Sequence, residues 1–317
     1  MSSGLSIEKV RKTLEVAGFQ VVNNLPSKSC FDLVARKGDF LMLLKVLVNV
    51  DGLKDEQGRE LRMLARRLSA TPIIVGERTR RSEMLDGVVY GRCGIPTLNF
   101  STFKQFVLEN VQPMVFARHG GLYTRIDGEA LKKARELKGL SLGNLAERVG
   151  VSRKTIYEYE RNEMDATLET ALKIEEELDA DVILPIDLKE WYSIYEYEEK
   201  REEKREWEDD LEREVFEALS SLGFKVILAR RAPFDALTAD QSEKCLVVTG
   251  VGKANERMIE KRVMMLDKLA FVTQKLAMFV MDKSRKIKGA KVPIISKEEI
   301  ESMEEPEELL KKVQSSN

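Results

Sequence analysis

Short apolar runs alternate with helical repeats of apolar residues at both ends of the chain. The first of these regions opens with a helical stretch before Gly18 and has a basic, Leu-rich helical stretch at residues 56–68. Short apolar runs bounded by turn residues are typical of buried strands, and a repeat of 3.6 residues is typical of a helix. The pattern predicts an α/β module that runs helix, strand, strand, helix, strand, strand, helix. Its main apolar runs lie at 40–50, 72–76 and 95–98.

Residues 213–317 repeat this order, with a basic helical stretch at 254–269. Each region closes on a Pro-containing strand and then a Ser, Ser101 or Ser296, that can cap a helix. The shared order of small motifs favours a duplicated module over two α/β domains that are alike by chance. The matching pairs are Leu14–Val21 with Leu219–Val226, Phe31-Asp32 with Phe234-Asp235, and Ile95–Leu98 with Val292–Ile295.

Between the two copies, residues 127–179 have the pattern of several short helices. Ser141 and Ser152 are good N-caps for two of them, because a Ser side chain accepts a hydrogen bond from a free amide of the first turn. Gly150 stands where the first of these helices ends in a left-handed conformation, which Gly adopts without strain. Small Ala146 lets the second helix cross closely. The apolar positions between the two helices are Leu145, Val149, Val151, Ile156 and Tyr159.

This stretch resembles the helix-turn-helix of the phage repressor/Cro family, and residues 167–175 resemble that family's fourth helix. The resemblance implies a four- to five-helix domain whose recognition helix, Ser152 to Arg161, reads the major groove of double-stranded DNA. The expected base-reading residues are Arg153, Lys154, Thr155, Tyr157 and Glu158, and the expected backbone contacts are Ser141, Ser152, Arg161 and Asn162. Lys154 is equally consistent with a solvated surface lysine. An αα-hairpin of coincidental spacing, or a helix-turn-helix that binds protein, is the alternative.

Charge is nearly balanced over the chain, with 52 Lys+Arg and 54 Asp+Glu, but it is unevenly distributed. Residues 1–118 carry net +6 and 213–317 net +3, whereas 119–185 carry −4 and 186–212 carry −7. Within 119–162 the net charge is only +3, which is a weak electrostatic footprint for a DNA-binding domain. We therefore expect affinity to come from a homodimer, as is usual for repressors of this type, or from the basic flanking modules.

The flanking modules resemble PD-(D/E)xK nucleases and archaeal junction resolvases. The resemblance rests on Phe31-Asp32 at a strand end and on the next strand, which carries Lys45. In that family an Asp and a second acidic residue hold Mg²⁺, and a Lys two positions later steadies the attacking water. Leu43 occupies the second acidic position here.

In the second copy Asp235 remains, but Val247-Val248-Thr249 replace the other catalytic positions. One carboxylate holds Mg²⁺ poorly, so both copies are predicted to be inactive and to need no cofactor. Asp32, Lys45 and Asp235 would then be relics of a catalytic site. A generic α/β sandwich, with Asp32 as a plain strand-end residue, is the alternative.

Residues 187–212 combine aromatic side chains with a run of alternating charges, Glu198 to Arg205. Opposite charges three and four residues apart favour an exposed helix, so an acidic helical linker is predicted to run into the first helix of the last segment. A dimerisation arm is the alternative. The aromatic residues concerned are Trp191, Tyr192, Tyr195, Tyr197 and Trp207.

Composition excludes several other classes of protein. No apolar run reaches the roughly 18 residues of a membrane span, and no signal peptide is visible. The three cysteines, Cys30, Cys93 and Cys245, are far apart, which disfavours disulfide scaffolds and structural zinc sites. A single histidine, His119, excludes most histidine-based catalysis. These features fit a cytoplasmic protein.

The whole chain resembles archaeal helix-turn-helix regulators of this layout, which implies a DNA-binding transcriptional regulator that is not an enzyme. Its parts would be an α/β nuclease-like module at 1–118, a repressor-type domain at 119–185, a linker at 186–212 and a second module at 213–317. A DNA-processing nuclease targeted by the helix-turn-helix and a protein-binding scaffold are the alternative functions. The operator, the target genes, the sign of regulation and any effector stay open.

Overall fold

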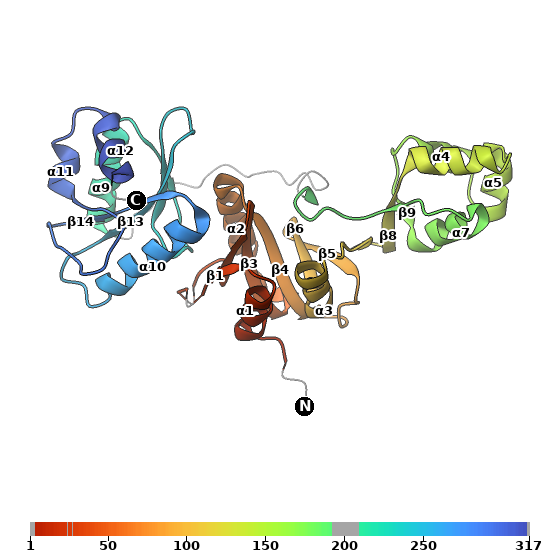
Figure 1. Ribbon diagram of the computed structural model, residues 1–317, viewed down its shortest axis with the longest axis horizontal. Helices are drawn as coiled ribbons and strands as arrows, with labels where there is room; N and C mark the ends of the chain where they lie inside the picture. Colours follow the sequence, from red (N-terminus) through yellow and green to blue (C-terminus); the bar gives the residue numbers. More distant parts are fainter. Residues whose placement is uncertain (1–3, 24, 27, 192–208, 316–317) are drawn as a thin grey trace. The chain divides into compact units, whose positions relative to one another are not determined.

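The computed structural model describes residues 4–23, 25–26, 28–191 and 209–315 (Figure 1). The chain forms two compact units, and each unit is assembled from several stretches of sequence. The first unit comprises Met1–Ala17, Val46–Lys54 and Ile73–Tyr197, and the second comprises Gly18–Lys45, Asp55–Pro72 and Glu198–Asn317. No helix of the described ranges is both long and apolar enough to cross a membrane.

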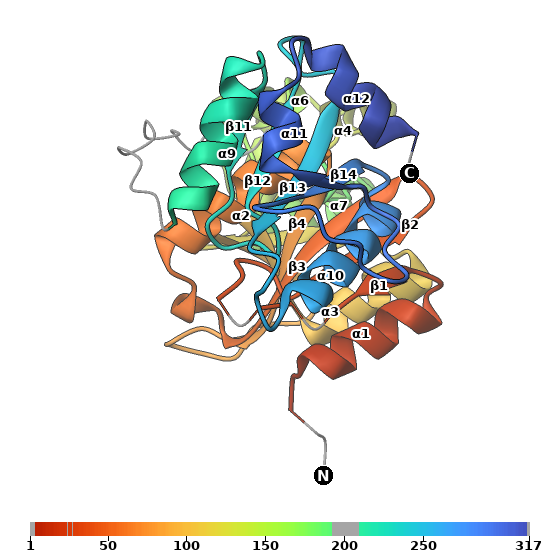
Figure 2. The same cartoon turned by 90° about the vertical axis from the view of Figure 1, so that its left-hand side faces the viewer.

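The second unit contains a five-stranded sheet between two helical layers. Its strands follow the order β11-β12-β13-β14-β15, in which the first two pairings are antiparallel and the last two are parallel. Helices α9, α11 and α12 bury their apolar side chains against one face, and α10 packs on the other (Figures 1 and 2). The elements are α9 (Asp210–Ser221), β11 (Lys225–Leu228), β12 (Ala236–Ala239), β13 (Leu246–Gly252), α10 (Ile259–Thr273), β14 (Leu276–Met281), β15 (Ile294–Ser296), α11 (Lys297–Glu301) and α12 (Pro306–Gln314).

The same unit contains a second antiparallel arrangement, from the N-terminal part of the sequence. Strand β1 (Gln20–Val22) pairs with β2 (Leu33–Lys37), and β2 pairs with β3 (Phe40–Asn49), which belongs to this unit as far as Lys45. Helix α2 (Asp55–Leu68) follows. Its strong amphipathicity comes from Leu61, Leu64 and Leu68 on one face and arginines on the other.

The first unit contains the strands that continue from residue 73 onward. They follow the order β4-β6-β5-β7-β8-β10, and β9 also pairs with β8. Helix α1 packs against η2 and α3 packs against β6. The elements are α1 (Ile7–Val16), η1 (Val50–Gly52), β4 (Thr71–Arg78), β5 (Val88–Arg92), β6 (Ile95–Asn99), α3 (Phe100–Lys104), η2 (Gln105–Glu109), β7 (Val115–Arg118) and β8 (Gly121–Ile126).

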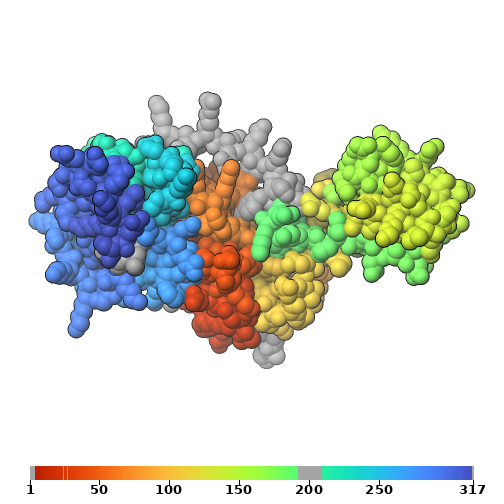
Figure 3. All heavy atoms as spheres, turned by 45° about the horizontal axis from the view of Figure 1, so that its top comes forward, coloured from red at the N-terminus to blue at the C-terminus, as the bar shows by residue number. Residues whose placement is uncertain are grey.

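The remainder of the first unit is a helical segment, residues 127–182, yellow to green in Figure 3. Four helices enclose one apolar core, built around Leu131, Leu145, Ile156 and Ile174. Two short strands connect the segment to β8: β9, between α6 and α7, and β10, after α7, both pair with that strand. The elements are α4 (Gly128–Leu137), α5 (Leu142–Val149), α6 (Arg153–Glu160), β9 (Ala166–Thr167), α7 (Leu168–Leu178) and β10 (Ile183–Leu184).

Two predicted helix starts are wrong. Helix α3 begins at Phe100 rather than after Ser101, because the Asn99 Oδ1 atom accepts a hydrogen bond from the Thr102 amide at 2.8 Å. Helix α9 begins at Asp210, since Asp209 has an extended backbone and caps the first turn, so no continuous helix runs into it from the linker. Ser296 caps α11 as predicted. Residues 192–208 lie outside the described ranges, and with them most of the predicted helical linker and its aromatic residues.

Candidate nucleic-acid interface

Helices α5 and α6 are set at a sharp turn by local side-chain caps. The Ser141 Oγ atom accepts from the Asn144 amide at 3.1 Å, and the Ser152 Oγ atom accepts from the Thr155 amide at 3.0 Å. Gly150 ends α5 in the left-handed conformation, with φ of 79°. All three residues behave as the sequence predicted, because caps and left-handed ends depend on the residues nearest to them.

The helical core holds α6 firmly against the helices behind it. Leu145, Val149, Ile156 and Tyr159 are buried, as the spacing predicted, and Val151 is partly buried against them. A buried ion pair ties α6 to α4: Arg135 donates through Nε to Glu160 Oε1 and through Nη2 to Glu160 Oε2, the second at 3.1 Å. A rigid support of this kind fixes the direction in which the outer face of α6 points.

The outer face of α6 presents one arginine, one lysine and one tyrosine to solvent. Arg153 and Lys154 are exposed, and Tyr157 is 46% exposed. Thr155 and Glu158 are half-buried, and the Thr155 hydroxyl lies 2.8 Å from that of Ser152. The Lys154 ammonium lies 3.4 Å from the Glu158 carboxylate. Of the five proposed base readers, Arg153, Lys154 and Tyr157 are therefore the most exposed, and Lys154 and Tyr157 already have a partner, Glu158 and Arg161 respectively.

The four proposed backbone contacts differ in what their side chains already do. Ser141 and Ser152 cap helix N-termini, where free amides point outward and favour an anion such as a phosphate. Arg161 pairs with Glu163 through Nε at 2.6 Å and donates to the Tyr157 hydroxyl at 3.0 Å. The Oδ1 atom of Asn162 accepts from the Gly128 amide at 2.9 Å, so Asn162 anchors α4 to the end of α6.

In the N-terminal nuclease-like site, Asp32 and Lys45 neutralise each other. The Lys45 ammonium lies 2.9 Å from Asp32 Oδ1 and donates to the Ser29 carbonyl at 2.9 Å. Leu43, at the position of the second acid, is completely buried. The residues that would hold Mg²⁺ therefore do not fit it: one carboxylate is engaged by a cation and the other is replaced by an apolar side chain.

The strand register identifies the equivalent positions in the C-terminal part. The Asp32 amide donates to the Leu44 carbonyl, and the Asp235 amide donates to the Thr249 carbonyl. The positions equivalent to Leu43, Leu44 and Lys45 are therefore Val248, Thr249 and Gly250. They lie one residue later than Val247-Val248-Thr249, which the sequence pattern had indicated. Neither the second acid nor the lysine is present.

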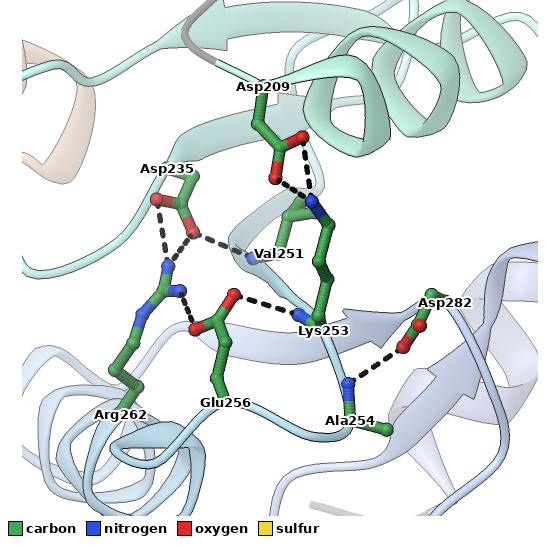
Figure 4. Close-up of polar contacts among 8 residues, drawn as sticks. All are labelled: Asp209, Asp235, Val251, Lys253, Ala254, Glu256, Arg262 and Asp282. Carbon is green, nitrogen blue, oxygen red and sulfur yellow. Dashed lines mark hydrogen bonds and ion pairs between the residues drawn. The ribbon is translucent and has the colours of Figure 1, made fainter.

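An arginine from α10, which sequence analysis missed, takes the place of the lysine (Figure 4). Arg262 Nη2 lies 2.8 Å from Asp235 Oδ2, and Arg262 Nη1 lies 3.2 Å from Glu256 Oε2. Burial raises the pKa of Asp235, while Arg262 and the Val251 amide act in the opposite direction. Within the described ranges, no three His, Cys, Asp or Glu side chains are grouped so as to hold a metal ion. This site is an ion-pair network in which the carboxylates are already occupied.

Comparison with known proteins gives family matches for two regions of the chain. Residues 5–113 match the model of a PD-(D/E)XK superfamily domain, and residues 131–182 match a helix-turn-helix model. A protein of Thermococcus gammatolerans is 38% identical over 308 residues, covering 97% of this chain and 95% of that protein. One of Archaeoglobus fulgidus is 40% identical over 298 residues, covering 94% and 93%. Both are named "Putative HTH-type transcriptional regulatory protein".

A solved structure, the SinR protein/SinI protein complex, is 32% identical over 17% of this chain and 54% of that chain, with a TM-score of 0.17.

Proposed function

Because the chain belongs to this archaeal family of HTH-type transcriptional regulatory proteins, we propose that it is a sequence-specific DNA-binding regulator whose helix α6 reads the major groove. The observation that carries the proposal is the outer face of α6. It offers Arg153, Lys154 and Tyr157 to solvent while its inner face is buried in the helical core. A braced helix with free hydrogen-bond donors on its outer side suits base readout.

Arg153 is the principal base reader in this proposal, since a guanidinium matches guanine O6 and N7 with two hydrogen bonds. Lys154 must leave Glu158 to reach a base, so Glu158 competes with DNA for its charge. The N-termini of α5 and α6, at Ser141 and Ser152, would bind backbone phosphates and fix the position of α6 in the groove. Arg161 and Asn162 lie at the other end of α6, and Asn162 would act there through the fold rather than by direct contact.

A homodimer forms part of the proposal. Residues 119–162 carry a net charge of only +3, and counterion release at so few phosphates gives weak binding to one half-site. Two copies that bind half-sites about one helical turn apart would double the number of phosphate and base contacts, which raises both affinity and specificity.

We also propose that the α/β parts are two copies of one nuclease-like module, at 1–118 and 213–317, and that neither cuts DNA. The pairs Asp32–Lys45 and Asp235–Arg262 support this, because each carboxylate already has a cation in place of a metal ion. A nuclease targeted by the helix-turn-helix is the second candidate, favoured by the PD-(D/E)XK match over residues 5–113.

The decisive experiment selects binding sites from genomic fragments and compares variants on the best site and on random DNA. Arg153→Ala with Lys154→Ala is expected to abolish the preference, with about 1–3 kcal/mol lost for each base contact, and to keep weak nonspecific binding. Lys132→Ala with Lys133→Ala is the matched control, since it removes two exposed charges from α4. An unchanged preference in the first variant would show that α6 is not the reading element. Light scattering on the bound complex tests the dimer.

A further inference from the structure

The two α/β copies correspond residue by residue, at a nearly constant spacing of 205 positions. Buried Val10, Leu14 and Phe19 correspond to buried Val215, Leu219 and Phe224. The pairing Gln20↔Arg36 in β1 and β2 corresponds to Lys225↔Ala239 in β11 and β12. After helices α2 and α10, Ser69 and Gln274 both take the left-handed conformation. This agreement in burial, strand register and backbone conformation assigns to each element of one copy its equivalent in the other.

Within the second unit, the two copies meet at three places. The loops that precede the two Phe-Asp pairs are joined by a hydrogen bond from the Cys30 amide to the Arg231 carbonyl, at 2.7 Å. The end of β2 reaches the end of α10, where Arg36 Nη1 donates to the Thr273 carbonyl at 3.2 Å. The end of α2 reaches the turn after β12, where Arg67 pairs with Glu243.

These three contacts have the reciprocity of a two-fold axis. Strand β2 is equivalent to β12, and helix α2 is equivalent to α10. The end of β2 contacts the end of α10, and the turn after β12 contacts the end of α2. The two loops before the Phe-Asp pairs contact each other. In a symmetric dimer, element i of one copy contacts element j of the other and j contacts i. We propose that the duplicated modules pair with each other inside one chain about a local two-fold axis, as the two halves of an internal dimer.

The two sides of this pairing surface differ in chemistry. Helix α10 packs on β13 and β14 and also on β1 and β2, and it buries Val263, Leu266, Leu269 and Val272 while Lys261 and Lys268 stay exposed. Apolar residues on two sides of a helix are stable only when both of those sides are covered. Helix α2 has a polar outer face instead, where Arg231 Nη2 lies 2.6 Å from Glu56 and the Arg231 amide donates to Glu60 at 2.6 Å.

This difference specifies the partner. If two identical N-terminal modules paired in this way, β1 and β2 would meet the polar face of α2 in place of α10, which would leave charges unpaired or apolar area exposed. The occupant of the surface is therefore the other module of the same chain. It follows that the regulator's own homodimer must use a different surface, and this inference holds whether or not α6 binds DNA.

A zero-length cross-link in the full-length protein tests the pairing. Arg67→Lys places an amine beside Glu243, and Lys225→Arg removes the amine that already pairs with that carboxylate. Treatment with a carbodiimide condenses a neighbouring amine and carboxylate to an amide. We expect peptide mapping of the double variant to find residue 67 joined to Glu243. The pair Lys297–Glu214, at 2.7 Å within one copy, is the internal control for the chemistry.

An equal mixture of isotope-labelled and unlabelled protein separates pairing within a chain from pairing between chains. Only same-isotope links are expected. Mixed-isotope links would overturn the proposal in favour of exchange between two chains, and loss of the 67–243 link while Lys297–Glu214 forms would overturn the pairing itself. Adding Arg231→Glu is expected to lower the link yield severalfold, whereas Arg213→Glu, an exposed ion-pair residue on α9, is expected to leave it unchanged.

Discussion

Arg135 of α4 and Glu160 of α6 form a buried ion pair that joins the first helix of the helical segment to α6. Arg135 is 8% exposed, and its Nη1 atom also donates to the Leu140 carbonyl at 2.8 Å. Removal of one partner from a buried pair leaves an uncompensated charge. We expect Arg135→Met to lower the free energy of unfolding by about 3–5 kcal/mol.

Urea unfolding measures this loss. The control is Arg148→Met, whose ion pair with Glu177 is largely solvated and is expected to contribute less than about 1 kcal/mol. The double variant with Glu160→Leu should be more stable than Arg135→Met alone, because no lone charge stays buried. If the single and double variants are equally unstable, the cost is one of packing rather than of charge.

Gly128, at the start of α4, allows α4 and α6 to approach closely. A Cβ atom added there would lie 2.5 Å from the Glu160 carbonyl oxygen, which is backbone and cannot rotate away. We expect Gly128→Ala to lower the free energy of unfolding by about 1–3 kcal/mol, as in other overpacked cores, and to displace α6. Thermal unfolding followed by circular dichroism measures it.

Gly143 in α5 is the matched control, because the nearest atom to its added Cβ is the Ser141 Oγ at 3.9 Å. Gly143→Ala should be neutral or stabilise by about 0.5–1 kcal/mol, as expected when Ala replaces Gly inside a helix. A Gly128→Ala protein as stable as the parent would mean that the two helices do not cross as closely as described.

Features that depend on neighbouring residues could be predicted from the sequence. Ser141, Ser152 and Gly150 act within one helical turn of their own positions, so the two short helices and the apolar residues between them followed from spacing, and the resemblance to the repressor/Cro family identified them as a helix-turn-helix. The wrong start of α3 at Ser101 and the wrong continuation into α9 have the same local origin, since Asn99 and Asp209 cap the first turns of these helices.

Contacts between distant residues could not be predicted in this way. Arg135 and Glu160 are 25 positions apart, and Asp235 and Arg262 are 27 apart, and no periodic pattern relates either pair. The catalytic triplet of the second copy was misplaced by one residue, because the strand register, set by Asp235 and Thr249, became visible only in the sheet. Topology, rather than composition, determines such neighbours.

We predict that the protein does not cut DNA, because ion pairs occupy both nuclease-like sites. Incubation with Mg²⁺ or Mn²⁺ and supercoiled or branched DNA should give no product, and Asp32→Ala should not change this. The variant should instead lose stability, because Lys45 would stay buried without its counter-ion. Metal-dependent cutting that Asp32→Ala abolishes would restore the nuclease as the leading function.

Basic residues of the first unit should add to DNA affinity through the phosphate backbone. Arg80 and Arg81 lie in the loop after β4 and, with Arg92 and Asp51, line a hollow of about 450 Å³. The Asp51 carboxylate is engaged by the Arg80 amide at 2.8 Å, and neither Arg80 nor Arg81 forms an ion pair with the described residues. Two guanidiniums held at one hollow without carboxylate partners are well placed to bind phosphates.

The salt dependence of binding tests this contribution separately from base reading. Each phosphate contact contributes about 0.9 to the slope of log K against log salt, so Arg80→Ala with Arg81→Ala should reduce the slope by about 1.8. Sequence preference should not change, because backbone contacts carry no base information. Arg213→Ala, which removes an exposed arginine from α9, is the control. A slope identical to that of the parent would exclude these arginines from the DNA interface and leave a second copy of the chain as the source of the missing affinity.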